Sequence, residues 1–135
     1  ATATSAQYAD LAERYATDTP VEAGDVVMLG GIEEITKCEE AVSDAVFGVV
    51  SSSPAYLMNS EAGNNDTHPA IALTGRVPVK VRGTGKAGDR IVSAGSGEAR
   101  VAAEDEATTF NTLGRLIKDK YNEETALTEC VIGVK

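Results

Sequence analysis

The chain has 135 residues, the size of one domain, and a formal net charge of −9 at pH 7 from 12 Lys and Arg against 21 Asp and Glu. That charge argues against a nucleic-acid partner, because proteins that neutralise phosphates are basic. No run of 18 apolar residues and no signal-peptide pattern is present, so we expect no membrane partner. With 4% aromatic residues and 13 Gly, the composition favours a mainly β fold of short strands and tight turns.

A short amphipathic helix is predicted at the N-terminus, over residues 6–16. Its apolar stripe follows the helical spacing i, i+3, i+4, i+7 and consists of Tyr8, Leu11, Ala12 and Tyr15. Ser5 is suited to cap the first turn, and Pro20 ends the pattern. About three turns of helix are marginal alone, so the stripe must pack on another surface. We therefore expect residues 1–20 to form an arm and residues 21–135 to form a single β domain.

Seven short strands rich in β-branched residues are predicted after residue 20. They span residues 25–29, 45–50, 70–81, 90–94, 99–102, 113–118 and 126–135. In the third, Val77, Val79 and Val81 alternate with basic residues and a proline, which predicts inward valines. Pro78 has no amide N–H and predicts an edge strand or a bulge at that point.

A repeated sequence element indicates an internal duplication. Ala-Gly-Asp precedes a strand twice, in VEAGDVVMLGG and in GKAGDRIVSAG. A later glycine follows in each, 24 positions after Gly24 at Gly48 and 26 positions after Gly88 at Gly114. Two similar β units in one small β-barrel or β-clip domain would produce this echo. The alternative is that Ala-Gly-Asp is an ordinary turn before any strand.

The stretch between the two repeats, residues 51–69, is predicted to be a loop. It is rich in Ser, Asn, Gly and Pro, and loops of this length usually have a function or are disordered. Its one apolar cluster is formed by Tyr56, Leu57 and Met58. Such a cluster fits solvent poorly, so it either folds back on the core or is buried by a neighbouring subunit.

No catalytic, metal or cofactor site is predicted. His68 is the only histidine, which argues against a two-histidine metal site and favours a surface or hydrogen-bonding role. The GTGKAGD stretch lacks the spacing of a phosphate-binding loop, and the acidic stretches lack the pattern of a calcium loop and indicate solvated edges. Cys38 and Cys130 are either small buried hydrophobes or a disulfide.

Several segments together resemble a known family. YADLAERY, VEAGDVVMLGG, AVFGVVSSSPAYLMN and HPAIALTGRVPVKV occur in this order over about residues 5–95. Their order and spacing resemble a module of tailed-bacteriophage virion proteins, found near the C-termini of tail fibres and appendages; residues 96–135 lie outside the resemblance. The resemblance implies a largely β, trimeric protein. In some members it also implies an intramolecular chaperone whose chain is cleaved autocatalytically near a serine just before an Ala-Asp-x-Ala-Glu motif.

Carried over to this sequence, the motif is Ala9, Asp10, Ala12 and Glu13, and the nearest serine is Ser5. Ser5 is not adjacent to the motif, and four residues precede it. We therefore expect no self-cleavage here. A product already cut at this point and a stand-alone relative that never cleaves both fit.

We accordingly expect a non-enzymatic structural protein of the bacteriophage particle, made in the host cytoplasm and located on the virion exterior. A homotrimeric capsid decoration or cement protein, docked on the major capsid protein or other virion proteins, suits a small chain. The alternative is a tail-fibre tip or chaperone module, and a third reading is an autoproteolytic domain. The predicted interface residues lie in the arm and the loop: Tyr8, Leu11, Tyr15, Tyr56, Leu57 and Met58.

Overall fold

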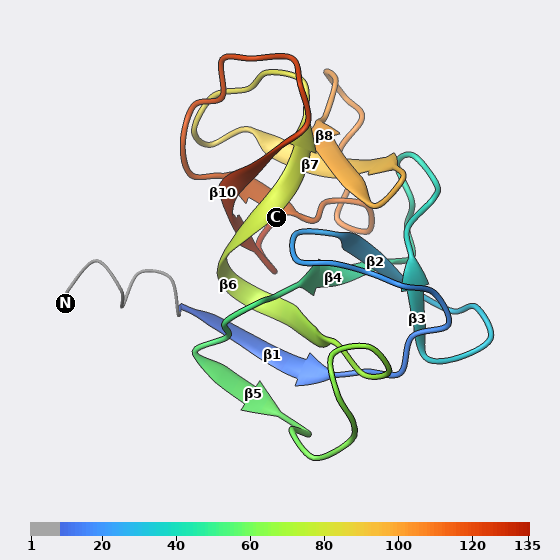
Figure 1. The fold of residues 1–135 in the computed structure, drawn as a ribbon. Helices are drawn as coiled ribbons and strands as arrows, with labels where there is room; N and C mark the ends of the chain where they lie inside the picture. The colour runs from blue at the N-terminus through green and yellow to red at the C-terminus, as the bar shows by residue number, and fades with distance from the viewer. Residues whose placement is uncertain (1–8) are drawn as a thin grey trace, which may run out of the picture.

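The longest strand, β6, runs through the middle of the molecule and is shared by two sets of strands (Figure 1). The computed structural model describes residues 9–135, which form ten β-strands and no helix. In chain order these are β1 (Asp10–Arg14), β2 (Val26–Leu29), β3 (Ile35–Lys37), β4 (Val46–Val50), β5 (Tyr56–Met58), β6 (Ala70–Arg82), β7 (Arg90–Gly95), β8 (Glu98–Val101), β9 (Gly114–Leu116) and β10 (Ala126–Ile132). The predicted mainly β fold is confirmed.

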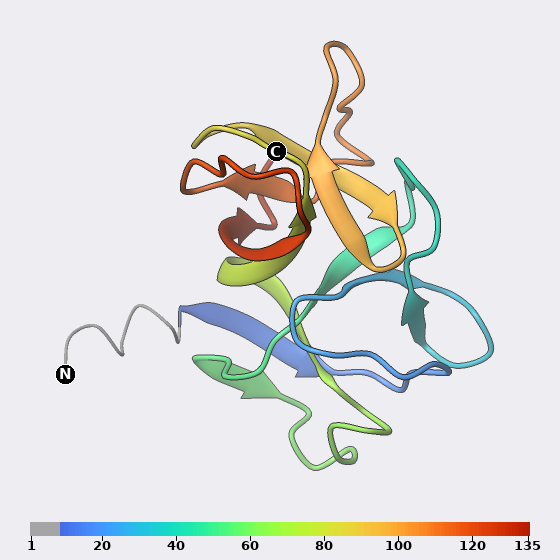
Figure 2. The same ribbon diagram turned by 45° about the horizontal axis from the view of Figure 1, so that its top comes forward.

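The second half of β6 belongs to a closed five-stranded barrel, here called the C-terminal unit. Its strands pair in the order β6, β10, β9, β7 and β8, and β8 returns to β6 to close the ring. The closing pair is parallel, with Val81 opposite Ala99, whereas the other pairs are antiparallel. Figure 2 shows these strands gathered in the upper part of the molecule.

The first half of β6 belongs to the N-terminal unit. Its strands pair in the order β3, β2, β4, β6 and β1. The chain after β1 then reaches β3, where Thr17 and Ile35 form a parallel bridge. This bridge closes the N-terminal unit in the same way as the parallel β6–β8 pair closes the barrel. Strand β5 is added outside this ring and pairs only with β1.

The Ala-Gly-Asp turn has the same structure in both units. The Asp25 carboxylate accepts a hydrogen bond from the backbone N–H of Glu22 at 2.9 Å, and Asp89 accepts one from Lys86 at 2.9 Å. The glycine before each aspartate has a positive φ, 91° and 94°, which few other residues adopt. The two parallel closing contacts are separated by the same 64 positions as the two turns. The predicted internal duplication is present in the structure.

A second glycine in each repeat allows two strands to approach closely. A Cβ atom on Gly48 of β4 would lie 2.4 Å from the Ala72 carbonyl oxygen of β6. A Cβ atom on Gly114 of β9 would lie 2.1 Å from the Val131 carbonyl oxygen of β10. Both positions therefore require glycine because the neighbouring backbone occupies the space of a side chain.

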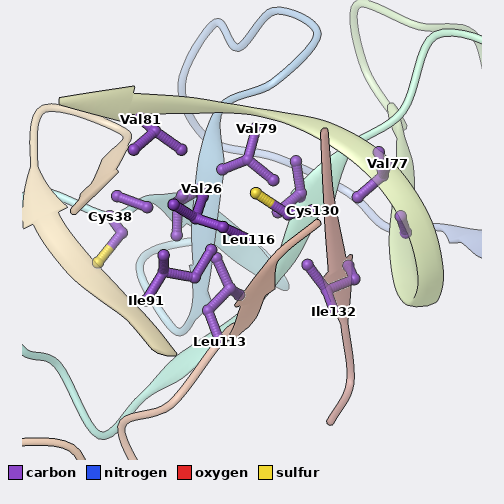
Figure 3. Packing of buried hydrophobic residues seen from close by; sticks show 13 residues of the cluster. Val26, Cys38, Val77, Val79, Val81, Ile91, Leu113, Leu116, Cys130 and Ile132 are labelled. Atoms are coloured by element: carbon purple, nitrogen blue, oxygen red, sulfur yellow. The ribbon is translucent and has the colours of Figure 1, made fainter. Parts of the chain in front are cut away.

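A buried apolar cluster fills the C-terminal unit and extends toward β2 and β4 (Figure 3). Val77, Val79 and Val81 are at most 2% exposed, which confirms the period-two prediction for β6. Cys38 and Cys130 are buried free thiols in the same cluster, so the first interpretation is confirmed and the disulfide alternative is wrong. Burial raises the pKa of the Cys130 thiol to about 12, which keeps it protonated and unreactive at neutral pH.

The predicted N-terminal helix is wrong where the structure describes it, because Asp10–Arg14 forms strand β1. Residues 1–8 lie outside the described residues. Strand β1 pairs with β5 on one edge and β6 on the other, and Ala12 is completely buried. Helix propensity differs by less than about 1 kcal/mol per residue for ordinary residues, so two paired edges and a buried face outweigh it. The boundary between an arm and a domain at residue 20 stays a prediction, although β1 is hydrogen-bonded into the N-terminal unit.

The seven predicted strands correspond to β2, β4 and β6–β10, whereas β1, β3 and β5 are additional. Pro78 lies in the central strand β6, at a point where one side of β6 pairs with no other described strand. The N–H of Lys80 points to that side and donates to the Gly24 carbonyl at 3.0 Å. Alternate residues direct their backbone groups to the same side, so the missing N–H of Pro78 falls there too. On this side of β6, β4 pairs up to Ala72 and β8 pairs from Val81 onward. The predicted edge is therefore confined to the residues between these two pairings.

Candidate functional site

The predicted contact residues of the arm and of the loop lie on neighbouring strands. The Tyr-Leu-Met segment forms β5, which runs parallel to β1 with Leu11 opposite Tyr56 and Ala12 opposite Leu57. The other edge of β5 pairs with no strand within residues 9–135, and Figure 1 shows β5 at the lower border of the fold. Unpaired backbone groups on an edge strand can hydrogen-bond with another chain. The β1–β5 edge is therefore a candidate interaction surface.

The three side chains of β5 differ in exposure. Tyr56 is 64% exposed, whereas Leu57 and Met58 are half-buried. The interpretation that the cluster folds back on its own core thus applies in part to Leu57 and Met58. Tyr56 presents an apolar ring with a polar tip to solvent, and tyrosine is enriched at protein interfaces.

Tyr15 and Leu11 have different surroundings, although both belong to the predicted stripe. The Tyr15 ring packs edge-on against Phe47, with ring centroids 5.0 Å apart, beside the buried cluster of the N-terminal unit. Its hydroxyl donates to Glu13 at 2.8 Å, and burial together with this carboxylate raises the pKa of Tyr15 to about 12. Leu11 is half-buried beside β5. Leu11 therefore contributes to the β1–β5 edge, and Tyr15 contributes to the core. Tyr8 lies outside the described residues.

Arg14 fixes the segment that follows β5. Its guanidinium donates to the Ser60 carbonyl at 3.1 Å, to the Asn65 side chain at 2.9 Å and to the His68 carbonyl at 2.7 Å. The His68 ring nitrogen Nδ1 lies 3.1 Å from the Thr67 hydroxyl. The predicted hydrogen-bonding role of His68 is confirmed, and the loop is tied to the end of β1.

A pocket lies where the two units meet along β6. It has a volume of about 190 Å³ and is bordered by the start of β1, the loop after β4, the first Ala-Gly-Asp turn, β6 and β10. Its polar lining includes Asp10, Arg76, Glu129 and the serines of residues 51–53, and Leu127 and Pro78 form part of the apolar wall. Arg76 donates to Glu129 at 3.3 Å, so these two charges neutralise each other.

Asp10 is the unusual residue of this pocket. It is 3% exposed, and its Oδ2 atom is buried without a hydrogen-bond partner. Burial raises the pKa of Asp10, an effect opposed by the Ser51 side chain and nearby backbone N–H groups. Sequence reasoning identified Asp10 only as part of a motif. Its burial was not predictable, because the neighbouring segments come from distant parts of the chain.

Exposed aromatic residues on the C-terminal unit were also not predicted as contacts. Phe110 is 75% and Tyr121 is 85% exposed.

In the nearby acidic stretch, Glu106 accepts two hydrogen bonds from Arg100, at 2.7 and 2.9 Å. These bonds and the Ala103 N–H lower the pKa of Glu106 to about 2. The prediction of a purely solvated edge is therefore wrong for Glu106, which has a structural partner.

Within residues 9–135, no group of three or more His, Cys, Asp or Glu side chains is arranged to hold a metal ion. The same part of the chain contains no helix long and apolar enough to cross a membrane. The predicted absence of cofactors and of a membrane partner stays a prediction.

Comparison with solved structures shows that the fold occurs in proteins of bacteriophage phi29. The chain matches pre-mature gene product 12 with a TM-score of 0.64 at 15% identity, over 95% of this chain and 22% of that one. It matches the C-terminal fragment of gene product 12 with a TM-score of 0.62 at 16% identity, over 93% of this chain and 100% of the fragment. The head fiber gp8.5 N base gives a TM-score of 0.53 at 12% identity, over 89% and 91% of the two chains. No protein-family model and no curated protein matches the sequence.

At these low identities, the TM-scores of 0.53–0.64 establish a shared fold alone. The chain spans about a fifth of the pre-mature gene product 12 chain, whereas it spans the whole of the C-terminal fragment. The shared fold covers 89–95% of this chain.

Proposed function

We propose that this protein is a structural component of a bacteriophage particle and that it acts by binding rather than by catalysis. The observation that carries the proposal is the match over 89–95% of the chain to proteins named as phage gene product 12 and as a head fiber base. The segments that resemble phage virion modules in sequence, over residues 5–95, point to the same class independently of the fold.

The more specific proposal is a homotrimer that decorates the capsid exterior and binds the major capsid protein or another virion protein. The head fiber base, which this chain covers over 91% of its length, supports a place on the head. The exposed edge of β5 supports assembly, because an edge strand with an exposed tyrosine is stabilised by pairing with another chain. The proposed contacts are Leu11, Tyr56, Leu57 and Met58, joined by Tyr8.

A second candidate is a tail-fibre tip or chaperone module, including one produced by autoproteolysis. It is favoured by the match to the whole C-terminal fragment of gene product 12. The two candidates differ in location, because a decoration protein is found on heads and a fibre module on tails. Mass spectrometry of separated heads and tails from particles that contain the chain distinguishes them.

The structural role is tested by light scattering and by co-sedimentation of the purified chain with phage particles. We expect a mass of three chains and saturable binding to particles. Replacing Tyr56 by Asp should reduce the mass from three chains toward one, or weaken particle binding by about tenfold or more, because a charge then occupies a buried contact. The matched control is Tyr121→Asp on the C-terminal unit, which should change neither. A monomer that binds no particles would contradict the proposal.

A further inference from the structure

We propose that the pocket around Asp10 binds the guanidinium group of an arginine side chain from a basic surface of another virion protein. The observation that carries this inference is a carboxylate that is 97% buried, lines a pocket of about 190 Å³ and has one oxygen without a hydrogen-bond partner. A buried polar atom without a partner is costly, and native structures rarely keep one without a reason. This oxygen has less than 1 Å² exposed, so a donor that enters the pocket would supply the missing hydrogen bond after a small movement of the lining side chains.

The charges of the pocket favour a cationic donor. Arg76 and Glu129 are paired with each other, so Asp10 leaves the pocket with a net negative charge. Glu129 also pairs with Lys118 at 3.0 Å, so its carboxylate has two cationic partners, whereas the Oδ2 atom of Asp10 has no hydrogen-bond partner. A cation would therefore gain a charge-assisted hydrogen bond to Asp10.

The walls of the pocket favour a guanidinium over an ammonium group. Pro78 and Leu127 supply apolar lining, and the serines of residues 51–53 supply hydroxyl oxygens. A guanidinium is planar and weakly hydrated, and it has five N–H donors that can reach several acceptors at once. A compact ammonium group would lose more hydration against the apolar wall.

The sign of the protein's charge favours a partner other than a second copy at this pocket, whose lining does not include the β5 residues proposed for the trimer contact. A surface of net charge −9 attracts a basic surface more strongly than one of like charge. This choice of source rests on the proposed structural role, but the properties of the pocket do not. The experiment therefore tests the pocket and the source separately.

The pocket is tested by NMR titration of the full chain with propylguanidinium at pH 7. We expect saturable shifts of the amide signals of Asp10 and residues 51–53, and none with propylurea, which has a similar shape and no charge. Asp10→Asn should weaken propylguanidinium binding by about tenfold or more, because it removes the charge and keeps the size. The control Asp44→Asn alters an exposed carboxylate outside the pocket and should leave binding unchanged.

Three results would overturn the pocket proposal. The first is the absence of saturable shifts, and the second is equal binding to the Asp10→Asn variant. The third is binding only after Arg76→Gln, which would mean that the chain's own Arg76 is the occupant. If the pocket is open to an external donor, Arg76→Gln should instead strengthen the binding of propylguanidinium to Asp10. This variant removes a positive charge that would lie near the bound cation.

Acidification sharpens the assignment to Asp10. Of the two carboxyl groups that line the pocket, Glu129 has its pKa lowered by Lys118 and Arg76, whereas burial raises the pKa of Asp10. Binding should be lost as the Asp10 carboxyl group is protonated, with both carboxyl groups followed by NMR on the same samples. A loss of binding that follows the titration of Glu129 instead would assign the interaction to the wrong carboxylate.

The source of the arginine is tested with the Asp10→Asn variant in assembly. We expect its oligomeric mass to equal that of the parent and its binding to particles to weaken. A lower oligomeric mass would show that a second copy supplies the group and would overturn the proposed source. Failure of both proteins to bind particles, with propylguanidinium binding intact, would count against the structural role and not against the pocket.

Discussion

The N-terminal and C-terminal units have the same strand arrangement, but the chain segment that precedes the last strand differs between the two units. In the C-terminal unit, residues 117–125 join β9 to β10 and are folded around Lys120, whose buried ammonium donates to the carbonyls of Gly83, Asn122 and Glu124 and to the Asn122 side chain. In the N-terminal unit, the longer connection of residues 51–69 forms β5 and one wall of the pocket. The same position in the repeat is thus filled by the chain's own contacts in one unit and carries an edge strand and a pocket in the other.

The comparison teaches that duplication allows one copy to specialise. In the C-terminal unit, the Lys120 side chain satisfies the carbonyl groups of the connection. The N-terminal unit carries the exposed edge strand and the buried carboxylate without a partner. We therefore assign stability mainly to features that both units share, and binding to features that only the N-terminal unit has.

The largest effect is expected at the two equivalent glycines. Gly48→Ala and Gly114→Ala each place a methyl group against a backbone carbonyl that side-chain movement cannot displace. Each should lower the free energy of unfolding by about 3 kcal/mol or more, as for severe overpacking. Urea denaturation measures this, and the exposed control Ala103→Val should change it by less than about 0.5 kcal/mol. If only one glycine variant is destabilised, the two units do not share this packing requirement.

The next effect concerns the connection of the C-terminal unit. Lys120→Met removes the ammonium and leaves four oxygen atoms without their donor. We expect a loss of about 2–3 kcal/mol in unfolding free energy, with no loss of particle binding. The control Lys86→Met changes an exposed lysine and should be nearly neutral. A loss of binding in a folded Lys120→Met protein would show that this connection also has a binding role.

A third comparison separates Leu11 of β1 from Tyr15, the residue that follows β1. Tyr15→Ala removes the ring that packs on Phe47 and should cost about 2 kcal/mol of stability, because the side chain is half-buried. Leu11→Asp should keep most of the stability and reduce assembly, because Leu11 lies beside Tyr56 on the exposed edge. Thermal unfolding and light scattering on the same samples measure both. The reverse outcome would move the interaction surface away from β5.

The smallest effect is a pH dependence specific to the C-terminal unit. The pKa of Glu106 is lowered from 4.5 to about 2, mainly by its hydrogen bonds with Arg100. A lowered carboxyl pKa stabilises the folded state above the unfolded-state pKa, and this contribution is lost as the pH falls from about 4.5 to 2. The Glu106→Gln variant should therefore be less stable than the parent at pH 7 and should approach it at pH 2. A constant difference between the two proteins over this range would show that the ion pair does not contribute.

The strands that could be predicted are those with a strong local signal. The alternation of Val77, Val79 and Val81 predicts the buried face of β6, and the recurrence of Ala-Gly-Asp predicts the duplicated turn. Both are local patterns: the alternation follows the two-residue period of a strand, and the turn is closed by the Asp25 carboxylate, which accepts from the nearby Glu22 N–H. In the candidate site, the apolar cluster around Tyr56 was predictable for the same reason.

The remaining features were decided by tertiary structure. Residues 10–14 have the apolar spacing of a helix, yet they form β1 because distant strands β5 and β6 offer partners to both edges. Asp10 resembles a solvated helix residue in the sequence, and it becomes a buried carboxylate because β6, β10 and the loop after β4 meet around it. Local preferences amount to tenths of a kcal/mol per residue, whereas a paired edge and a buried face act over the whole strand. The sequence by itself therefore determined the repeat and its valine core, and only the assembled sheet determined where the edge strand and the pocket lie.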